Sequence, residues 1–117
     1  MTEAQFSQRL RRELKAQLPD AMIFKHNDHH TGGIPDFSLT YERKTTWVEV
    51  KLAGNRIENS PLQLETMRRL GRAAYVVWDA KSKLGDVFWV DHSFGQKCYF
   101  PFAMLVETLV SVFIKAE

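Results

Sequence analysis

Two neighbouring segments with the spacing of β-strands constrain the fold most. Apolar and polar residues alternate through residues 35–41, and the alternation returns in residues 45–52. This alternation is typical of strands that bury one face. Only the charged residues 42–44 separate the two segments, so the sequence predicts an antiparallel hairpin. The fold must then contain a sheet built around this hairpin.

The segments before the hairpin predict a helix and a strand. Residues 2–18 carry an apolar residue at every fourth position, namely Phe6, Leu10, Leu14 and Leu18. This period predicts a helix with one apolar stripe, which Pro19 ends. A short strand is expected over residues 21–25. Residues 26–33 are a polar loop that ends in two glycines, which permit a tight approach of the backbone.

The segments after the hairpin complete an α/β pattern. Ser60 and Pro61 are suited to the first positions of a helix, and Gly71 ends it. Residues 73–78 are strongly apolar, and a helix that crosses into this strand indicates parallel pairing with residues 45–52. A further strand is expected over residues 85–90 and an apolar helix over residues 101–115. The predicted order is α-β-β-β-α-β-β-α, a mixed sheet flanked by helices in one domain of residues 1–117.

Composition sets broad limits on the class of protein. With 44% hydrophobic and 26% charged residues, the chain of 117 residues is ordinary for one globular domain. The single cysteine, Cys98, excludes an intrachain disulfide and favours a reducing compartment. No apolar leader or spanning segment of roughly 20 residues is evident. We therefore expect a soluble cytoplasmic protein with no membrane partner.

Positive charge is gathered in two places although the net charge is only +2. One cluster lies in the first helix and the other follows residue 67; they comprise Arg9, Arg11, Arg12 and Lys15, and Arg68, Arg69 and Arg72. Each cluster fits a solvated helix face as well as it fits a patch that contacts phosphates. The sequence leaves these two interpretations open.

Three polar residues around the hairpin point to chemistry. Glu49 and Lys51 lie two positions apart, so they share one face of their strand, and Asp36 begins the preceding strand. Two carboxylates and an amine that converge at a sheet edge can hold a hard divalent cation beside a phosphate. This pattern indicates a phosphodiesterase.

Two further polar residues are candidates for the same site. Gln63 falls on the inward face of the predicted second helix, near its N-terminus, where it could bind Lys51, a water molecule or a phosphate. Glu3 begins the apolar stripe of the first helix, where a carboxylate is unusual unless a cation faces it. Glu13 is the competing acid of that helix.

The order of these residues resembles a known nuclease superfamily. Three fragments carry the resemblance: Gly33-Ile34-Pro35-Asp36, Val48-Glu49-Val50-Lys51 and Ser60-Pro61-Leu62-Gln63. Together they are similar to the motifs of PD-(D/E)XK nucleases, which have the restriction-endonuclease-like fold. They resemble the standalone VRR-NUC (virus-type replication-repair nuclease) branch most, and archaeal-type Holliday junction resolvases share much of the pattern.

The resemblance implies a metal-dependent deoxyribonuclease, with an endonuclease favoured. Mg²⁺ or Mn²⁺ would be bound by the carboxylates of Asp36 and Glu49, by the Val50 carbonyl and by Glu3 as an additional or outer ligand. Lys51 and Gln63 would act on the attacking water or the phosphate. The implied substrate is structured DNA from replication, repair or recombination, and the products would carry 5′-phosphate and 3′-hydroxyl ends.

The predicted loop over residues 26–33 is a second candidate for nucleic-acid contact. It holds His26, His29 and His30 around Asp28. A zinc site there would lack a defined fourth ligand, a loop that contacts phosphates is a stronger hypothesis, and a solvated polar loop is the alternative. The residues expected to contact nucleic acid are Lys25, His29, His30 and Arg68.

The predicted C-terminal helix raises the question of oligomeric state. Leu105, Leu109, Val112 and Phe113 cover one side of it, and Phe102, Val106 and Val110 cover another. A helix that is apolar on two sides needs more than one packing partner. The second partner is either the core or another subunit, so a homodimer through this helix is a working hypothesis.

Three rival functions stay open at this point. The first is a Holliday junction resolvase proper, which would act as a two-fold dimer with a strong preference for four-way junctions. The second is a catalytically silent nucleic-acid-binding module on the same fold. The third is a structural protein in which the acidic pair is incidental.

Overall fold

The structure, a computed structural model, describes residues 1–26, 33–54, 61–89 and 98–115. Its centre is a six-stranded sheet in the order β1-β2-β3-β4-β5-β6. The strands are β1 (Met22–Lys25), β2 (Phe37–Tyr41), β3 (Lys44–Leu52), β4 (Ala73–Asp79), β5 (Leu84–Trp89) and β6 (Phe100–Pro101). The helices are α1 (Glu3–Gln17), α2 (Pro61–Leu70), α3 (Phe102–Thr108) and its continuation η2 (Leu109–Ile114).

The predicted hairpin and the predicted crossover are both confirmed. β2 and β3 pair antiparallel, with Phe37 opposite Val48, through a turn in which Glu42 and Arg43 adopt positive φ. β3 and β4 pair in parallel, with Glu49 opposite Tyr75, and α2 lies between them in the sequence. The other neighbouring pairs, β1–β2, β4–β5 and β5–β6, are antiparallel, so the sheet is mixed.

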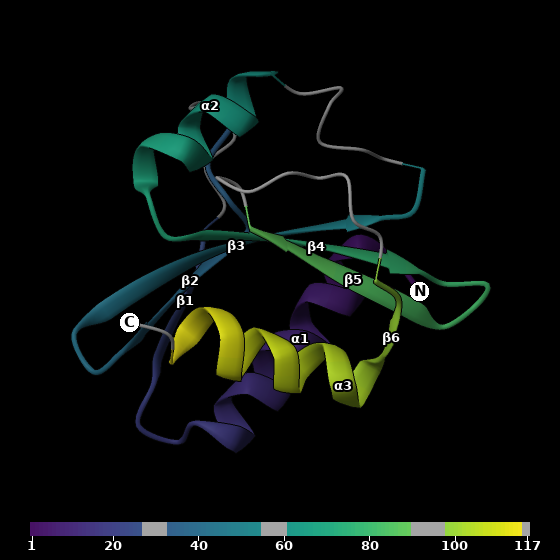
Figure 1. The fold of residues 1–117 in the computed structure, drawn as a ribbon, viewed down its shortest axis with the longest axis horizontal. Coiled ribbons are helices and arrows are strands. Elements are labelled where there is room, and N and C mark those ends of the chain that lie inside the picture. The colour runs from purple at the N-terminus through teal and green to yellow at the C-terminus, as the bar shows by residue number, and fades with distance from the viewer. Residues whose placement is uncertain (27–32, 55–60, 90–97, 116–117) are drawn as a thin grey trace.

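The helices form one layer on each face of the sheet (Figure 1). α2 covers one face, whereas α1 and α3 lie together on the other. The main core is on the side of α1 and α3, and it takes Val48 and Val50 from β3. A smaller cluster of Met67, Ala73 and Tyr75 lies under α2. The sheet therefore has a large apolar face and a smaller, more polar one.

Local signals explain where α1 begins and ends. Thr2 caps its N-terminus in a capping box with Gln5. The predicted stripe of Phe6, Leu10 and Leu14 is fully buried. At the other end, Lys15 Nζ donates to the backbone carbonyl oxygens of residues 19 and 21 at 2.8 and 2.6 Å. This contact binds the turn after α1 to the start of β1.

The C-terminal part of the chain differs from the prediction in two details. A two-residue strand, β6, precedes the last helix. The helix itself changes from α to π geometry at Leu109, and Arg72 Nη1 donates to the carbonyl oxygens of Phe113 and Ile114 at its end. An apolar repeat does not distinguish these two helical forms, so the sequence pattern could not reveal the change.

The apolar residues of the last helix find partners within the chain. Leu105, Val106, Leu109 and Phe113 are all buried in the main core. Packing within one protomer thus accounts for most of the surface that suggested a second subunit, and exposed Met104 and Val112 are what remains. Within the described residues, no helix is both long enough and apolar enough to span a membrane.

Candidate active site

The register of the hairpin brings the two predicted carboxylates together. Asp36 immediately precedes Phe37, which pairs with Val48, so Asp36 lies beside Glu49 on the α2 face of the sheet. The backbone N–H of Asp36 donates to Glu49 Oε1 at 3.1 Å, and the N–H of Val50 donates to Asp36 Oδ2 at 2.9 Å. These reciprocal hydrogen bonds fix both carboxylates relative to the strand ends.

Glu49 is a buried acid in an unusual electrostatic environment. Its residue is 2% exposed. Burial and the adjacent Asp36 carboxylate raise the pKa of Glu49 to about 8, although Lys51 and the Asp36 N–H oppose the rise. Two carboxylates in contact repel each other unless a proton or a cation lies between them. The pair therefore has the electrostatic character of a cation site.

Lys51 lies on the same face as Glu49, as predicted. Lys51 Nζ is 3.6 Å from Glu49 Oε2, and the Lys51 side chain is 26% exposed. Val48 and Val50, which alternate with Glu49 and Lys51 along β3, point into the main core on the other face of the sheet. Lys51 thus extends from the buried pair toward solvent, where its charge can meet an anion.

Gln63 completes this cluster from α2. It is buried, and its Nε2 donates to Glu49 Oε2. The other amide atom, Oε1, is buried without a hydrogen-bond partner among the described residues. Buried polar atoms are usually satisfied, so Oε1 is an acceptor left for a water molecule or a ligand. We name Asp36, Glu49, Lys51 and Gln63 the acidic-lysine cluster.

A close contact at Gly33 holds the two sides of the cluster together. Gly33 adopts φ of +95°, and a Cβ added there would lie 2.8 Å from Thr66 Oγ1 and 3.0 Å from Gln63 Cα. Only glycine combines this backbone conformation with so close an approach. The segment that leads to Asp36 therefore rests directly on the first turn of α2, which carries Gln63.

Glu3 contacts the strand that carries Glu49 and Lys51. Glu3 Oε1 accepts a hydrogen bond from the backbone N–H of Leu52 at 3.1 Å, one residue beyond Lys51. Glu13 lies ten residues further along α1, about 15 Å away. The contact with Leu52 places Glu3 at the end of β3, and its predicted role as a metal ligand stays a prediction. So does that of the Val50 carbonyl.

The structure places His26, from the loop predicted to contact nucleic acid, on this face together with residues that the sequence did not assign to the cluster. His26 stacks on Trp47 with ring centroids 5.1 Å apart, and His26 Nε2 lies 2.9 Å from Ser38 Oγ. Tyr75 on β4 pairs with Glu49 on β3, and buried Asp86 on β5 pairs with Val77 on β4. Strand alternation allowed each of these placements, but the register between distant strands was needed to select them.

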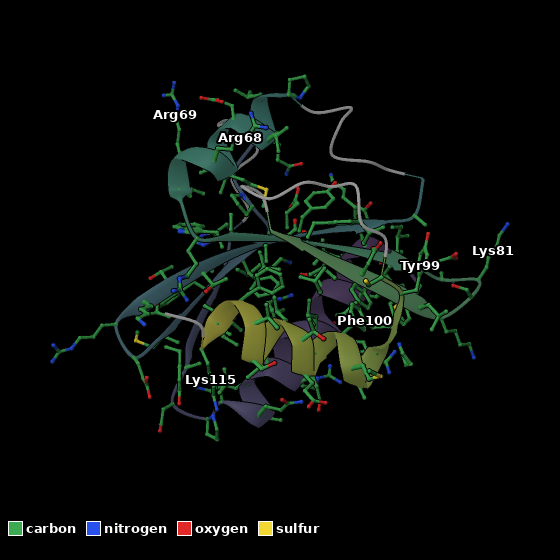
Figure 2. All side chains as sticks on the ribbon, in the orientation of Figure 1. Arg68, Arg69, Lys81, Tyr99, Phe100 and Lys115 are labelled. Atoms are coloured by element: carbon green, nitrogen blue, oxygen red, sulfur yellow. The ribbon has the colours of Figure 1, made fainter. Side chains whose placement is uncertain are left out.

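Of the residues predicted to contact nucleic acid, the two that the structure describes lie on different elements. Lys25 is exposed and pairs with Phe37, which places it on the face opposite to Asp36. Arg68 is exposed on α2 beside Arg69, which bonds to Glu65 (Figure 2). His29 and His30, with Asp28, lie outside the described residues. These contacts therefore stay predictions, and Lys25 is not placed beside the cluster.

The donor set is compatible with a hard divalent cation. Asp36 and Glu49 supply oxygen ligands, which Mg²⁺ and Mn²⁺ prefer, and Mg²⁺ is commonly held by one or two carboxylates together with water and phosphate. Among residues 1–26, 33–54, 61–89 and 98–115, no group of three or more His, Cys, Asp or Glu side chains is arranged to hold a metal ion.

Comparisons with known proteins agree with this architecture. No protein-family model and no curated protein match the sequence. Among solved structures, the chain is similar to Archaeoglobus fulgidus Hjc, a Holliday junction resolvase from an archaeal hyperthermophile. The similarity covers 84% of this chain and 90% of that chain, with 14% identity and a TM-score of 0.51. At this level of identity the similarity shows the fold: the chain has the predicted restriction-endonuclease-like α/β fold.

Proposed function

We propose that the protein is a metal-dependent nuclease that hydrolyses phosphodiester bonds in DNA. The observation that carries the proposal is the convergence of Asp36, Glu49 and Lys51, with Gln63 bonded to Glu49. Four polar residues from three separate segments meet on the more polar face of the sheet. A structural protein has no need for a buried, mutually repelling carboxylate pair at this position.

The cluster divides the work of phosphodiester hydrolysis among its members. Asp36 and Glu49 would hold Mg²⁺ or Mn²⁺, which supplies neutralisation of phosphate charge and a more acidic water. Lys51, on the exposed side of the pair, stabilises negative charge on the phosphate oxygens as the bond breaks. The 3.6 Å separation from Glu49 keeps the Lys51 ammonium close to where that charge develops.

Gln63 has a positioning role in this scheme. Its Nε2–H donates to Glu49 and fixes the carboxylate orientation, while Oε1 is available to accept a hydrogen bond from the attacking water. A neutral amide does both without adding charge to a site that already holds two acids. The burial of Gln63 excludes competing solvent from the same donor and acceptor.

The proposed substrate is branched or otherwise structured DNA. Support comes from the fold shared with an archaeal Holliday junction resolvase and from the motifs that resemble replication-repair nucleases. That likeness makes a resolvase proper the second candidate. The two differ in a measurable way, because a resolvase would cut four-way junctions in preference to flaps and would act as a two-fold dimer.

A cleavage panel tests the function. Linear duplex, single strand, flap, splayed arm and four-way junction are each incubated with Mg²⁺ or Mn²⁺. We expect Asp36→Asn and Lys51→Ala to reduce cleavage by about 100-fold or more while the folded structure is retained. Lys44→Ala is the matched control, since Lys44 is an exposed cation at the far end of the same strand.

Two results would contradict the proposal. Cleavage by Lys51→Ala at the wild-type rate would remove Lys51 from the chemistry. Absence of wild-type cleavage on every DNA with Mn²⁺ present would support the catalytically silent binding module. Activity that survives in Asp36→Asn would instead indicate a contaminating nuclease.

A further inference from the structure

A groove outside the acidic-lysine cluster lies between α1 and the edge strand β1. Its volume is about 510 Å³, and residues 21–24 line one side of it. From α1 the lining residues are Gln8, Arg11, Arg12 and Lys15. None of these lining residues is acidic, so the groove has a positive side with no internal counter-charge. We name it the α1–β1 groove.

The structure separates the four basic residues of α1 by what they contact. Arg9 lies over the Phe102 ring, 4.0 Å from its centroid. Lys15 donates to two backbone carbonyl oxygens, as described above. Arg9 and Lys15 therefore stabilise the fold through contacts within the chain. Arg11 and Arg12 have no such contact among the described residues, and both line the groove.

The unpaired donor of Arg11 is the most direct indication that the groove can bind an anion. Its side chain is half-buried, and its Nε is buried without a hydrogen-bond partner among the described residues. A guanidinium donor in this position costs free energy when it is left unsatisfied. An anionic oxygen in the groove would satisfy it, and guanidinium groups match phosphate geometry particularly well.

The opposite wall of the groove suits a nucleic-acid backbone. β1 is the edge of the sheet that the structure describes, so part of its backbone N–H groups face outward. Met22 and Phe24 are more than half exposed there. Backbone N–H groups and basic side chains supply most protein contacts to phosphates, and apolar side chains can cover the sugars between them.

We propose that the α1–β1 groove binds the phosphate backbone of DNA beside the cleavage site. The proposal rests on the proposed function for the identity of the ligand. Arg11 and Arg12 are the principal contacts, and exposed Lys25 extends the positive surface from the groove toward His26. The groove positions a duplex arm and takes no part in bond breaking.

The groove and the cluster are close in the plane of the sheet, although α1 and α2 lie on opposite faces, so a duplex arm in the groove would reach the cluster around the β1 edge. Met22 is four residues from His26, about 13 Å along β1, and β1 is two strands from β3, about 10 Å across the sheet. The separation is therefore on the order of 15 Å. At 3.4 Å per phosphate on one strand, this corresponds to roughly four to five nucleotides.

Binding without metal tests the groove separately from catalysis. The Kd of a labelled duplex and of a four-way junction is measured in EDTA over a range of NaCl concentrations. We expect the double variant Arg11→Gln, Arg12→Gln to bind about tenfold more weakly, with a salt slope reduced by about 2, because each lost phosphate contact lowers the slope by about 0.9. The Kd of the double variant Arg11→Lys, Arg12→Lys should stay within about threefold of the wild-type Kd, since this variant keeps the charge.

The control removes the same charge elsewhere. Lys81 and Lys83 are exposed in the turn between β4 and β5, at the opposite end of the sheet order, and Figure 2 shows Lys81 extending into solvent. Lys81→Gln with Lys83→Gln should change the Kd by less than about twofold. Urea midpoints of all variants verify that the fold is intact.

Several outcomes would overturn the inference. Equal losses of affinity and of salt slope in the Arg11→Gln, Arg12→Gln variant and in the Lys81→Gln, Lys83→Gln variant would assign the effect to net charge. A changed sedimentation coefficient with an unchanged Kd would make the groove an interface between two copies of the chain. Wild type that binds no DNA would also overturn it. Cleavage measured in parallel keeps the two proposals apart. Wild-type cleavage with no effect of the arginine substitutions on DNA binding would contradict this inference alone, whereas DNA binding without cleavage would contradict the proposed nuclease activity alone.

Discussion

The two faces of the sheet use the same strands for different purposes. Toward α1 and α3, β3 contributes Val48 and Val50 to a core of apolar side chains. Toward α2, the alternate residues Glu49 and Lys51 lie on the same face as a small apolar cluster around Met67. A single alternating strand therefore supplies both the apolar core and the proposed site, and the direction of each side chain decides which.

The difference teaches where polar burial is tolerated. The α2 face buries the carboxyl and amide groups of Glu49, Gln63 and Asp86, whereas the polar residues buried on the side of α1 and α3 carry only hydroxyl groups, namely Ser7 and Thr46. Buried polar groups cost free energy unless they are paired. The large apolar face can offset this cost, so we expect substitutions on the two faces to separate folding from function.

The largest expected effect compares one buried side chain from each face. Leu10→Ala and Met67→Ala each remove a fully buried apolar group, so each should lower the free energy of unfolding by about 2–5 kcal/mol in urea titrations. Leu10→Ala should leave the cleavage rate per folded molecule unchanged. Met67→Ala should lower it, because Met67 lies one turn from Gln63 on α2. Equal loss of rate in both variants would contradict the division between the faces.

Gly33 offers a sharper test of how the α2 face is held. Gly33→Ala introduces a Cβ 3.0 Å from two backbone atoms of α2 at a positive φ, so we expect a loss of about 1–3 kcal/mol and a lower cleavage rate as Asp36 and Gln63 separate. Gly54→Ala is the control, since Gly54 has a similar φ of +100° and nothing within 4 Å. If both variants behave alike, backbone strain alone explains the effect.

The buried acid Glu49 predicts that stability depends on pH through the α2 face. Because the pKa of Glu49 rises from 4.5 to about 8, native metal-free protein keeps a proton between these values that the unfolded chain has lost. This contribution to stability is complete below pH 4.5 and is lost as the pH rises through 8. The slope should reach at most about 1.4 kcal/mol per pH unit, measured by urea unfolding in EDTA.

Two comparisons isolate this contribution from other titrating groups. Glu49→Gln should remove the extra slope, because glutamine does not titrate. Mn²⁺ should reduce it in wild type, since a cation takes the place of the proton, and the apparent Mn²⁺ affinity should fall about tenfold per pH unit below 8. An identical slope in wild type and Glu49→Gln would place the titration elsewhere.

The features that could be predicted from the sequence alone are those that local periodicity determines. Alternation fixed the shared face of Glu49 and Lys51, and the short turn fixed the hairpin that delivers Asp36. Tyr75 joined the same face only through the register of a parallel strand, which depends on packing across the whole sheet. Local patterns contain no information on that register.

Long-range contacts account for the rest of what the sequence could not supply. The sequence left the basic cluster of α1 as either a solvated face or a phosphate patch. The structure gives the members of this cluster different surroundings. Arg9 stacks on the ring of Phe102, which is distant in sequence, whereas Arg11 lines the groove between α1 and β1. The start of α2 was predicted from Ser60, which lies outside the described residues, and α2 itself is described from Pro61.

The smallest expected effect decides the role of Glu3, a predicted metal ligand that comes from α1 on the apolar side of the sheet. Its hydrogen bond to the Leu52 N–H favours a positioning role at the end of β3. Glu3→Gln keeps an acceptor for that N–H and removes the charge, so we expect Mn²⁺ affinity within about threefold of wild type by calorimetry. Glu13→Gln is the control on the same helix. A loss of about tenfold or more in Glu3→Gln alone would make Glu3 a metal ligand, and the boundary between the two faces would then run through the catalytic site itself.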